Sequence, residues 1–468
     1  MRIIVIKILT LCFLFLVNSA HLCASPQVFP RDTITDTVRC QSDAGQSYSL
    51  YLPQHYDKSK EWPVILILDP SARGKTGVSV FLEAGKKYGF ILAGSNNVRN
   101  GPMEESFTAA SVLLPDLISR FNIDPKRIYV AGFSGASRFA MALAVKDRRI
   151  SGVIGCGAGL PGDNYYNPSA SSGFLYYGLV GNRDMNYLEM CDLPSLFNNH
   201  TGVIYYIRTF SGLHEWPDPE LLTDAVEWLI LQSMNRKVIP TDQTFISRIE
   251  EKTQGLISST QSGGDIVDAT KYMRFAARDF AGTPFGSGMT ALVAESEKSS
   301  DYQKGTLKRN KIAETEKQRR EKYMSHLMST ARSGSMPDSV SAWWRDEIQS
   351  LVRMRDKGAS EKSQMASRLL NFVSIVSFEQ GIIHYRSSFF TQASIFFKIC
   401  TISDSENPYS YYNLSRSLAK EGKVRESLDA LSAAVKHGLN SKKTVISEPA
   451  FIILKNEARY KELTDKLK

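Results

Sequence analysis

The sequence predicts an α/β fold, with a doubly wound and mostly parallel sheet, followed by an all-α region. Short β-branched and aromatic runs alternate with helical patterns between about residues 37 and 235, and this alternation is typical of parallel strands with helices on both faces. After Pro240 strand signals nearly vanish and polar helical segments dominate. A chain of 468 residues with 43% hydrophobic content is long enough for roughly three domains.

Eight segments have the residue pattern of strands. Two short ones precede six more buried runs, and they lie around Val38 and at residues 48–52, 64–68, 90–93, 128–131, 152–155, 174–177 and 203–207. Helical patterns separate most of them, at residues 78–88, 106–121 and 137–145, and a closing helix is expected at 217–235. Pro115 is expected to kink the second helix. We take residues 25–238 as the sheet domain.

The first 24 residues have the pattern of a cleaved secretory signal. Arg2 and Lys7 precede an apolar stretch, and small residues follow it. The apolar stretch is too short to cross a bilayer of about 30 Å. A lipid anchor at Cys23 is not favoured, because residues 20–22 do not resemble the usual lipoprotein box. We therefore expect a periplasmic or secreted protein that does not meet nucleic acid.

The cysteines after the signal are too few and too scattered for a disulfide-stapled protein, and most are expected to be buried thiols: Cys40, Cys156, Cys191 and Cys400. Neither a CxxC motif nor a His-rich pair is present. The sequence therefore predicts no metal site, and we expect no cofactor.

A helical connecting region is expected at 239–365 and a repeat at 366–468. Five positions recur 34 residues later: Ser377, Gly381, Ala393, Phe397 and Cys400 correspond to Tyr411, Ser415, Ser427, Leu431 and Ala434. The period resembles that of tetratricopeptide repeats, in which small residues let paired helices approach closely. The resemblance implies either a protein partner or packing on the chain's own sheet domain.

A basic run precedes the repeat. Residues 304–322 contain eight Lys or Arg residues against three Glu. Glu316 and Arg320 have i,i+4 spacing, which favours a solvated helix face. An anionic envelope surface is the alternative partner for this run.

Ser134 is the strongest functional candidate. It lies between a predicted strand and an Ala-rich helix, in a Gly-x-Ser-x-small turn flanked by Gly132, Gly135 and Ala136. A strand that runs straight into a helix leaves room only for a sharp corner that displays the serine hydroxyl. The first amides of the helix point toward the same spot, where they can stabilise an oxyanion. The motif predicts a nucleophile.

A nucleophilic serine needs a base and a third group that orients the base. His214 follows the last predicted strand, whereas the other histidines lie before the central strands, in a polar loop, in the helical half or in the signal. Asp184 follows the preceding strand in a Gly-led turn, and Asp192 and Glu215 are the alternatives. The order Ser134, Asp184, His214 is that of α/β-hydrolases.

Residues 47–230 resemble the α/β-hydrolase superfamily, in particular its secreted polyhydroxybutyrate depolymerase-like and feruloyl esterase-like branch. The segments that carry the resemblance are 51–56, 123–134, 181–184 and 212–217. It implies serine esterase chemistry through an acyl-enzyme, with Ser134 as nucleophile, His214 as acid and base, and Asp184 as orienter. It also implies that the Gly135 amide is one oxyanion donor.

Two positions depart from the family pattern. Relatives usually have His-Gly after the strand that ends here at Leu68, but this chain has Asp69 and Pro70. Because Pro70 lacks an N–H, the second oxyanion donor is expected to be Ser71 or Ala72. Loss of one such donor can lower the rate about 100-fold or more. The milder departure is Ala136, where relatives often have a second glycine.

Three functional hypotheses follow. The leading one is an exported serine hydrolase of carboxylic esters, on acylated carbohydrate or aryl groups that stack on Tyr165, Tyr166 and Trp216 at an open, polar mouth. A prolyl oligopeptidase-like serine peptidase shares the fold and the order of the triad. A hydrolase-like domain that has lost activity within a periplasmic interaction scaffold is the third, and the altered loop at Asp69 and Pro70 favours it.

Overall fold

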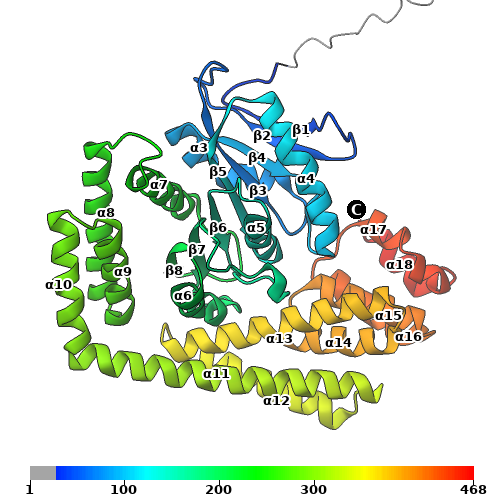
Figure 1. Cartoon of the computed structure of the whole chain (residues 1–468). Helices are drawn as coiled ribbons and strands as arrows, with labels where there is room; N and C mark the ends of the chain where they lie inside the picture. The colour runs from blue at the N-terminus through cyan, green and yellow to red at the C-terminus, as the bar shows by residue number, and fades with distance from the viewer. Residues whose placement is uncertain (1–27) are drawn as a thin grey trace, which may run out of the picture.

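The computed structural model describes residues 28–468, without the side chains of Asn199 and His200. The expected signal at 1–24 and the alternative anchor at Cys23 lie outside these residues. A sheet with flanking helices occupies the N-terminal part of the described chain, and helices alone make up the rest (Figure 1). This confirms the predicted fold class.

The sheet has eight strands in the order β1-β2-β4-β3-β5-β6-β7-β8. β2 pairs antiparallel with β1 and β4, and all the remaining pairs are parallel. The strands are β1 (Ile34–Arg39), β2 (Ser47–Tyr51), β3 (Trp62–Leu68), β4 (Ile91–Ser95), β5 (Ile123–Phe133), β6 (Gly152–Cys156), β7 (Leu175–Gly181) and β8 (Ile204–Phe210). All eight lie where the sequence predicts them. Strands such as residues 64–68 of β3 are fully buried, and a strand that is covered on both faces has a continuous apolar sequence that is easy to recognise.

Seven helical segments belong to the sheet domain: α2 (Gly74–Val80), α3 (Leu82–Tyr88), α4 (Met103–Arg120), α5 (Gly135–Lys146), the short η1 (Asn164–Tyr166), α6 (Tyr187–His200) and α7 (Pro219–Asn235). The sequence predicts a single helix at 78–88, but the structure has two, because α2 ends and α3 begins at Phe81. Helix α6 is absent from the prediction because Pro194 interrupts its pattern. Pro115 lies inside α4.

The predicted helical region is also present. Its elements are α8 (Gln243–Ser262), α9 (Ile266–Asp279), α10 (Pro284–Lys298), α11 (Ser300–Ser333), α12 (Asp338–Arg355), α13 (Glu361–Arg386), α14 (Phe390–Ser403), α15 (Pro408–Lys420), α16 (Val424–Lys436), α17 (Lys442–Ile446), η2 (Pro449–Leu454) and α18 (Ala458–Asp465). Within residues 28–468, no helix is both long and apolar enough to cross a membrane.

The buried apolar residues form three clusters. The first contains the sheet with its helices and extends into α8, α9 and α10 through Ile257, Tyr272 and Met289. The second joins α11 to α14, and the third joins α15 to α18. The domain limits at 238 and 365 stay a prediction.

Small residues bring the helices of the repeat together, as the sequence predicts. A Cβ at Gly381 of α13 would lie 2.6 Å from the Phe397 ring of α14. In the next pair, the hydroxyls of Ser415 and Ser427 each donate to the other's carbonyl oxygen at 2.8 Å. The resemblance to tetratricopeptide repeats stays a prediction.

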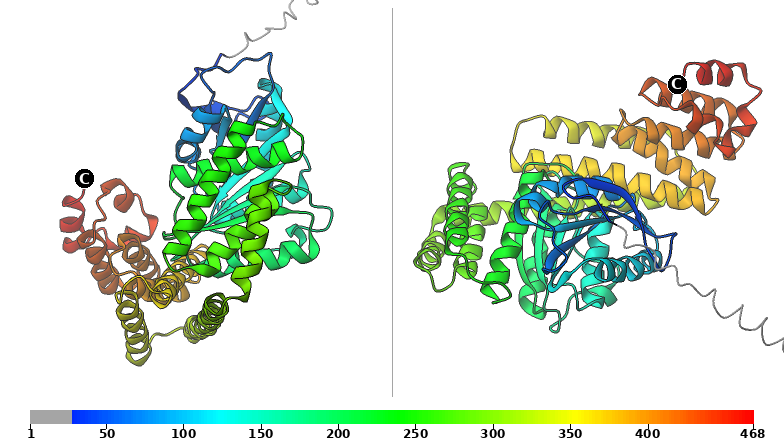
Figure 2. Two further views of the ribbon diagram at one scale, coloured as in Figure 1. Left: turned by 90° about the vertical axis from the view of Figure 1, so that its left-hand side faces the viewer. Right: turned by 90° about the horizontal axis from the view of Figure 1, so that it is seen from above.

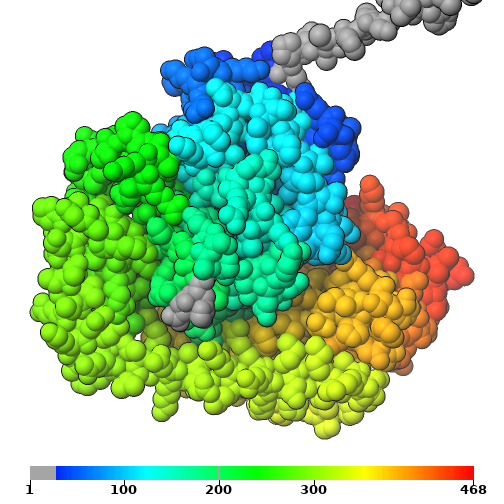
Figure 3. Space-filling model, in the orientation of Figure 1, coloured from blue at the N-terminus to red at the C-terminus, as the bar shows by residue number. Residues whose placement is uncertain are grey.

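The helical region lies along two sides of the sheet domain. Helices α8 to α10 stand beside the β8 edge, and α11 and α13 run below the end of the sheet in the view of Figure 1. Figure 2 shows the same arrangement from two further directions, and Figure 3 shows the long α11 against the lower surface of the sheet domain.

The basic run of α11 is not simply a solvated face. Glu316 is fully buried, and the side chains of Arg320 and Arg309 are only 20% and 25% exposed. Arg320 binds the carbonyl of Met185 in the sheet domain and Arg309 pairs with Asp265 and Asp268 beside α9, while Lys308 and Lys317 remain in solvent. The expectation was therefore wrong for one side of the helix, because i,i+4 spacing does not reveal which face another domain covers.

Candidate active site

Ser134 occupies the sharp corner that the sequence predicts. It follows β5 directly and precedes α5, and its φ of 54° is unusual for a residue with a side chain. Its N–H donates to the carbonyl of Cys156 at 2.8 Å. A Cβ at Gly132 would lie 2.4 Å from the carbonyl oxygen of Ala136, so only glycine allows the strand and the helix to meet this closely.

His214 and Asp184 lie within hydrogen-bond reach of each other and of Ser134. His214 Nε2 is 2.8 Å from Ser134 Oγ. On the other side of the ring, Nδ1 is 2.9 Å from both carboxylate oxygens of Asp184. The imidazole is 12% exposed and the carboxylate 1%. The three side chains follow β5, β8 and β7, whose carboxyl ends meet at one edge of the sheet.

Gly157 forms the floor beneath this chain of hydrogen bonds. Its φ is +68°, and a Cβ there would lie 3.0 Å from Asp184 Oδ2 and 3.3 Å from His214 Cε1. The ring of Phe133 packs on the imidazole, with 4.8 Å between ring centroids. Any side chain at position 157 would push on Asp184 and His214 together.

The loop after β7 fixes the Asp184 carboxylate. The backbone N–H of Asn186 donates to Asp184 Oδ1 at 2.8 Å, and the Asn186 side chain donates to the carbonyl of Gly157. The two alternative acids lie elsewhere. Asp192 pairs with Lys317, and Glu215 accepts the N–H of Leu213.

A second buried carboxylate, Asp69, follows β3 at the same edge of the sheet. It accepts two bonds from Arg73, one from the Ser71 N–H at 2.8 Å and one from the Trp216 indole N–H at 3.0 Å. Burial raises the pKa of the Asp69 carboxyl, but the hydrogen bonds from Arg73, Trp216 and Ser71 outweigh it and hold the pKa below its usual value.

This arrangement occupies the two amides that the sequence offers as second oxyanion donors. The Ser71 N–H points to the Asp69 carboxylate, and the Ala72 N–H donates to the Asp69 carbonyl at 3.0 Å. Ala72 also has a φ of 57°. In this conformation neither amide is available to an oxyanion, whereas the Gly135 N–H lies at the start of α5 next to Ser134.

Asn100 comes close to the same place from the loop after β4. A Cβ at Gly135 would lie 2.2 Å from Asn100 Oδ1 and 3.1 Å from Nδ2, so the amide fills the space that a side chain at 135 would take. The Asn100 N–H donates to the carbonyl of Pro70 at 2.8 Å. Sequence reasoning missed Asn100, because no motif marks it.

The aromatic residues proposed for substrate stacking lie in different surroundings. Trp216 packs on Phe133 at 5.5 Å and donates to Asp69. Tyr165 is 68% exposed and accepts a bond from Lys146 at the far end of α5, which is roughly 18 Å along the helix from Ser134 at 1.5 Å per residue. Tyr166 packs on Phe107. The structure does not bring Tyr165 to the triad.

The helical region contributes a charge near His214. The pKa of Glu379, on α13, lies above its usual value because the surrounding protein excludes water, and the charges of His214 and Arg138 offset this only in part. The sequence holds no signal that α13 approaches the triad.

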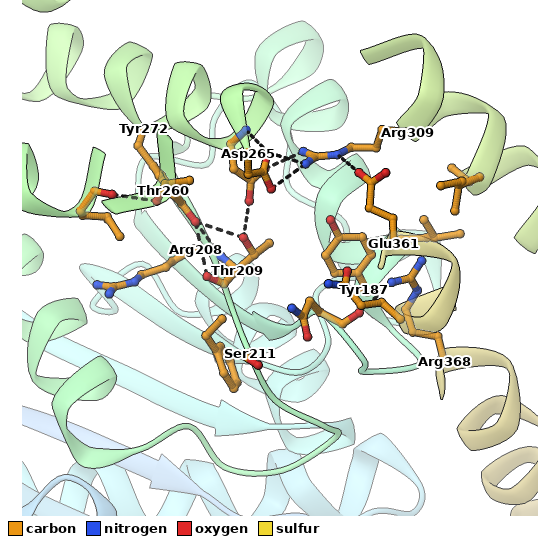
Figure 4. A pocket seen from close by; sticks show the side chains of 18 residues that line it. Tyr187, Arg208, Thr209, Ser211, Thr260, Asp265, Tyr272, Arg309, Glu361 and Arg368 are labelled. Carbon is orange, nitrogen blue, oxygen red and sulfur yellow. Dashed lines mark hydrogen bonds and ion pairs between the residues drawn. The ribbon is translucent and has the colours of Figure 1, made fainter. Parts of the chain in front are cut away.

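A cavity of about 320 Å³ lies beside the triad, between β8, α6 and the helical region (Figure 4). Its charged side chains all have partners: Arg309 pairs with Asp265 and Asp268 of the lining, whereas Arg208 and Arg368 pair with Asp224 and Glu316 outside it. Tyr187 and Arg368 both line it, with the Arg368 guanidinium lying over the Tyr187 ring. Ser134 and His214 are not among its lining residues.

The described cysteines are free thiols, and Cys40, Cys156 and Cys400 are buried. Burial raises the pKa of Cys191 and of Cys40 to about 11. At neutral pH these thiols are therefore protonated and poor nucleophiles.

Comparisons with known proteins return solved esterase structures. Est1E from Butyrivibrio proteoclasticus is 14% identical, with 43% of this chain and 100% of that chain covered at a TM-score of 0.34. A feruloyl esterase module from Clostridium thermocellum, complexed with sinapinate, is 11% identical over 42% of this chain and 86% of its own, at 0.33. An S-formylglutathione hydrolase from Agrobacterium tumefaciens is 13% identical over 41% and 90%, at 0.32. No family model and no curated protein matches the sequence.

Proposed function

We propose that this protein is an exported serine hydrolase that cleaves carboxylic esters through an acyl-enzyme. The observation that carries the proposal is the unbroken line of hydrogen bonds from Ser134 Oγ through His214 to the buried Asp184 carboxylate. Such a line lets a neutral serine attack a carbonyl carbon at neutral pH.

Each residue has one role in the proposed reaction. As Ser134 Oγ attacks the ester carbonyl, His214 Nε2 takes its proton, and Asp184 stabilises the imidazolium that forms. The negative oxygen of the tetrahedral intermediate is held by the Gly135 N–H at the positive end of α5. His214 then returns the proton to the alcohol that leaves, and the same base activates the water that releases the acyl group.

The second oxyanion donor is proposed to be the Asn100 side chain. Its amide lies against Gly135 and has no hydrogen-bond partner among the described residues, while the amides of Ser71 and Ala72 are engaged within their own loop. An asparagine amide can donate to an oxyanion as a backbone N–H does. We expect Asn100→Ala to lower kcat about 100-fold or more with little change in KM, whereas Asn100→Gln retains part of the activity. An unchanged kcat in Asn100→Ala would exclude this donor.

Acylated carbohydrates and aryl esters are the proposed substrates. The engaged loop amides favour one rival, a domain that has lost activity and acts as a scaffold with the repeats. A prolyl oligopeptidase-like peptidase is the other alternative, and a panel of proline-containing peptides beside short acyl esters tests it.

Labelling and hydrolysis test the proposal directly. The purified protein is treated with a fluorophosphonate probe and assayed on p-nitrophenyl acetate, and Ser134→Ala is compared with Ser79→Ala, which removes an exposed helix hydroxyl. We expect Ser134→Ala to abolish labelling and lower kcat by about 10⁴-fold or more, while Ser79→Ala behaves as wild type. A wild-type protein that neither reacts with the probe nor hydrolyses esters supports the scaffold.

A further inference from the structure

Three side chains of the helical region bind the backbone on either side of Asp184. Arg368 of α13 donates to the carbonyl of Asn182 at 2.7 Å. Asn371, one turn further along, donates to the carbonyl of Arg183 at 3.1 Å. Arg320 of α11 donates to the carbonyl of Met185 at 2.5 Å. The loop that presents the acid is thus held at the two residues before Asp184 and at the one after it.

A single buried carboxylate joins the two arginines. Glu316 Oε2 accepts from Arg368 Nε at 2.8 Å and Nη2 at 2.7 Å, and Glu316 Oε1 accepts from Arg320 at 2.5 Å. The side chains of Glu316 and Arg368 are 0% and 3% exposed. We call this set of three residues the Arg-Glu-Arg bridge. The Arg368 guanidinium also lies over the Tyr187 ring, at 4.6 Å from its centroid, and Figure 4 shows both side chains.

The bridge is geometrically demanding. Buried charges are tolerated only when each has its partners in good geometry, and guanidinium groups hold carboxylates in a fixed, planar arrangement. Helices α11 and α13 are therefore held against each other, and one further N–H of each arginine points to a fixed position. Those positions are the carbonyls of Asn182 and Met185.

We propose that the Arg-Glu-Arg bridge and the neighbouring Asn371 together position Asp184 for catalysis, so that the helical region is a working part of the active site. The inference rests on the function proposed above. These four are positioning residues, because they act on Asp184 through the backbone of its neighbours and touch neither His214 nor Ser134. A displacement of about 1 Å in such a site can lower the rate by about 100-fold.

The alternative is that the bridge merely attaches the helical region. A matched contact of that kind exists at Arg278 of α9, which donates to the carbonyl of Tyr205 at 2.7 Å near the start of β8. Arg278 also pairs with a carboxylate, that of Asp279. Both arginines join the two regions, but only Arg368 binds the loop that carries the acid.

The experiment compares Arg368→Lys with Arg278→Lys in the full chain. Lysine keeps the charge but cannot reach Glu316 and Asn182 together. We expect Arg368→Lys to lower kcat for p-nitrophenyl acetate about 10- to 100-fold, with KM within about 2-fold of wild type, and Arg278→Lys to leave kcat unchanged. Equal kcat in the two variants would overturn the proposal.

A second, milder variant tests the proposal if Arg368→Lys does not fold. If Arg368→Lys loses its helical circular dichroism, Asn371→Leu decides the question, because it removes one hydrogen bond to Arg183 and no charge. We expect its kcat to fall about 3- to 10-fold, the loss of one bond, with unchanged dichroism. Wild-type kcat in a folded Asn371→Leu would then overturn the proposal.

Proton NMR separates this proposal from the proposed function. The Nδ1–H of His214 gives a low-field resonance while it is hydrogen-bonded to Asp184, whether or not the protein turns over an ester. We expect Arg368→Lys to shift or broaden it and Arg278→Lys to leave it in place. A resonance unchanged in folded Arg368→Lys refutes positioning. An altered resonance in a protein without esterase activity supports positioning and refutes the esterase function.

Discussion

Two buried carboxylates lie at the same edge of the sheet but in opposite electrostatic settings. Asp69 follows β3 and Asp184 follows β7, and both are almost completely buried. Each binds one side chain of the loop after β8, since Asp69 accepts from Trp216 and Asp184 from His214. Asp69, however, is neutralised by Arg73, whereas the side-chain partner of Asp184 is His214.

This difference in partner distinguishes a carboxylate with a structural role, Asp69, from one that can stabilise a protonated histidine, Asp184. The charge of Asp69 is matched by a permanent cation, so it organises its loop and anchors Trp216. The charge of Asp184 is left for an imidazole, which becomes cationic only when it takes a proton. Burial and hydrogen bonding alone therefore do not identify the acid of a triad, and the identity of the partner does.

Replacing each carboxylate by its amide gives the strongest test of whether Asp184 and Asp69 have different roles. We expect Asp184→Asn to lower kcat by about 10³- to 10⁴-fold, because the amide cannot stabilise the imidazolium and favours the wrong tautomer. Steady-state kinetics on p-nitrophenyl acetate measure the effect. If Asp69→Asn lowered kcat by the same factor, the two carboxylates would not differ in role.

Asp69→Asn should instead act on stability. The amide loses the ion pair with Arg73, whose side chain is 55% exposed and can be rehydrated, so we expect a loss of about 2 to 3 kcal/mol in the free energy of unfolding. kcat should fall less than about 10-fold. Urea unfolding followed by circular dichroism checks the first number, with Asp163→Asn in an exposed loop as the control.

A third buried carboxylate, Glu227 of α7, is structural like Asp69, and it should make the free energy of unfolding depend on pH. Burial raises its pKa, but hydrogen bonds from Lys252, Tyr88 and Arg248 outweigh this and lower it to about 2. Its contribution is thus fully present above the unfolded value of about 4.5 and is lost as pH falls toward about 2, with up to about 3 kcal/mol at stake. Unfolding free energies at pH 6 and pH 3 measure it. Glu227→Gln should flatten this dependence, and a slope equal to that of wild type would contradict it.

Trp216→Phe should have the smallest effect. It keeps the ring that packs on Phe133 but removes the N–H that binds Asp69. One lost hydrogen bond to a charged, buried acceptor corresponds to about 1 to 3 kcal/mol in unfolding free energy. We expect kcat to change less than about 3-fold. A large fall in kcat with stability intact would place Trp216 in contact with the substrate instead.

The sequence predicted the eight strands and the positions of Ser134, Asp184 and His214 because these depend on local patterns. A buried β-branched run, a glycine-flanked serine and a residue just after a strand are visible over a few positions. Helix α6 escaped prediction because Pro194 and a polar end disguise it. The Asp69 loop was predicted as a source of oxyanion amides, whereas Asp69 itself accepts them, through its carboxylate from Ser71 and through its carbonyl from Ala72.

Contacts between distant segments could not be predicted. The bond from Arg368 to Asn182 joins residues 186 positions apart, and the charged pattern around Glu316 is as compatible with a solvated helix as with a buried one. The approach of Glu379 to His214 is of the same kind. Such contacts depend on how two domains dock, and a single sequence carries no periodicity for docking.

Because Asp184 and Arg368 lie far apart along the chain, they are synthesised at different times. A ribosome that has reached Asn235 has already made every strand of the sheet and the three side chains of the triad, and N-terminal domains generally fold first during synthesis. Helix α13 is made more than a hundred residues later. The newborn sheet domain therefore carries a serine and a histidine before the Arg-Glu-Arg bridge exists, so in our proposal helices that are synthesised later complete a site that forms earlier.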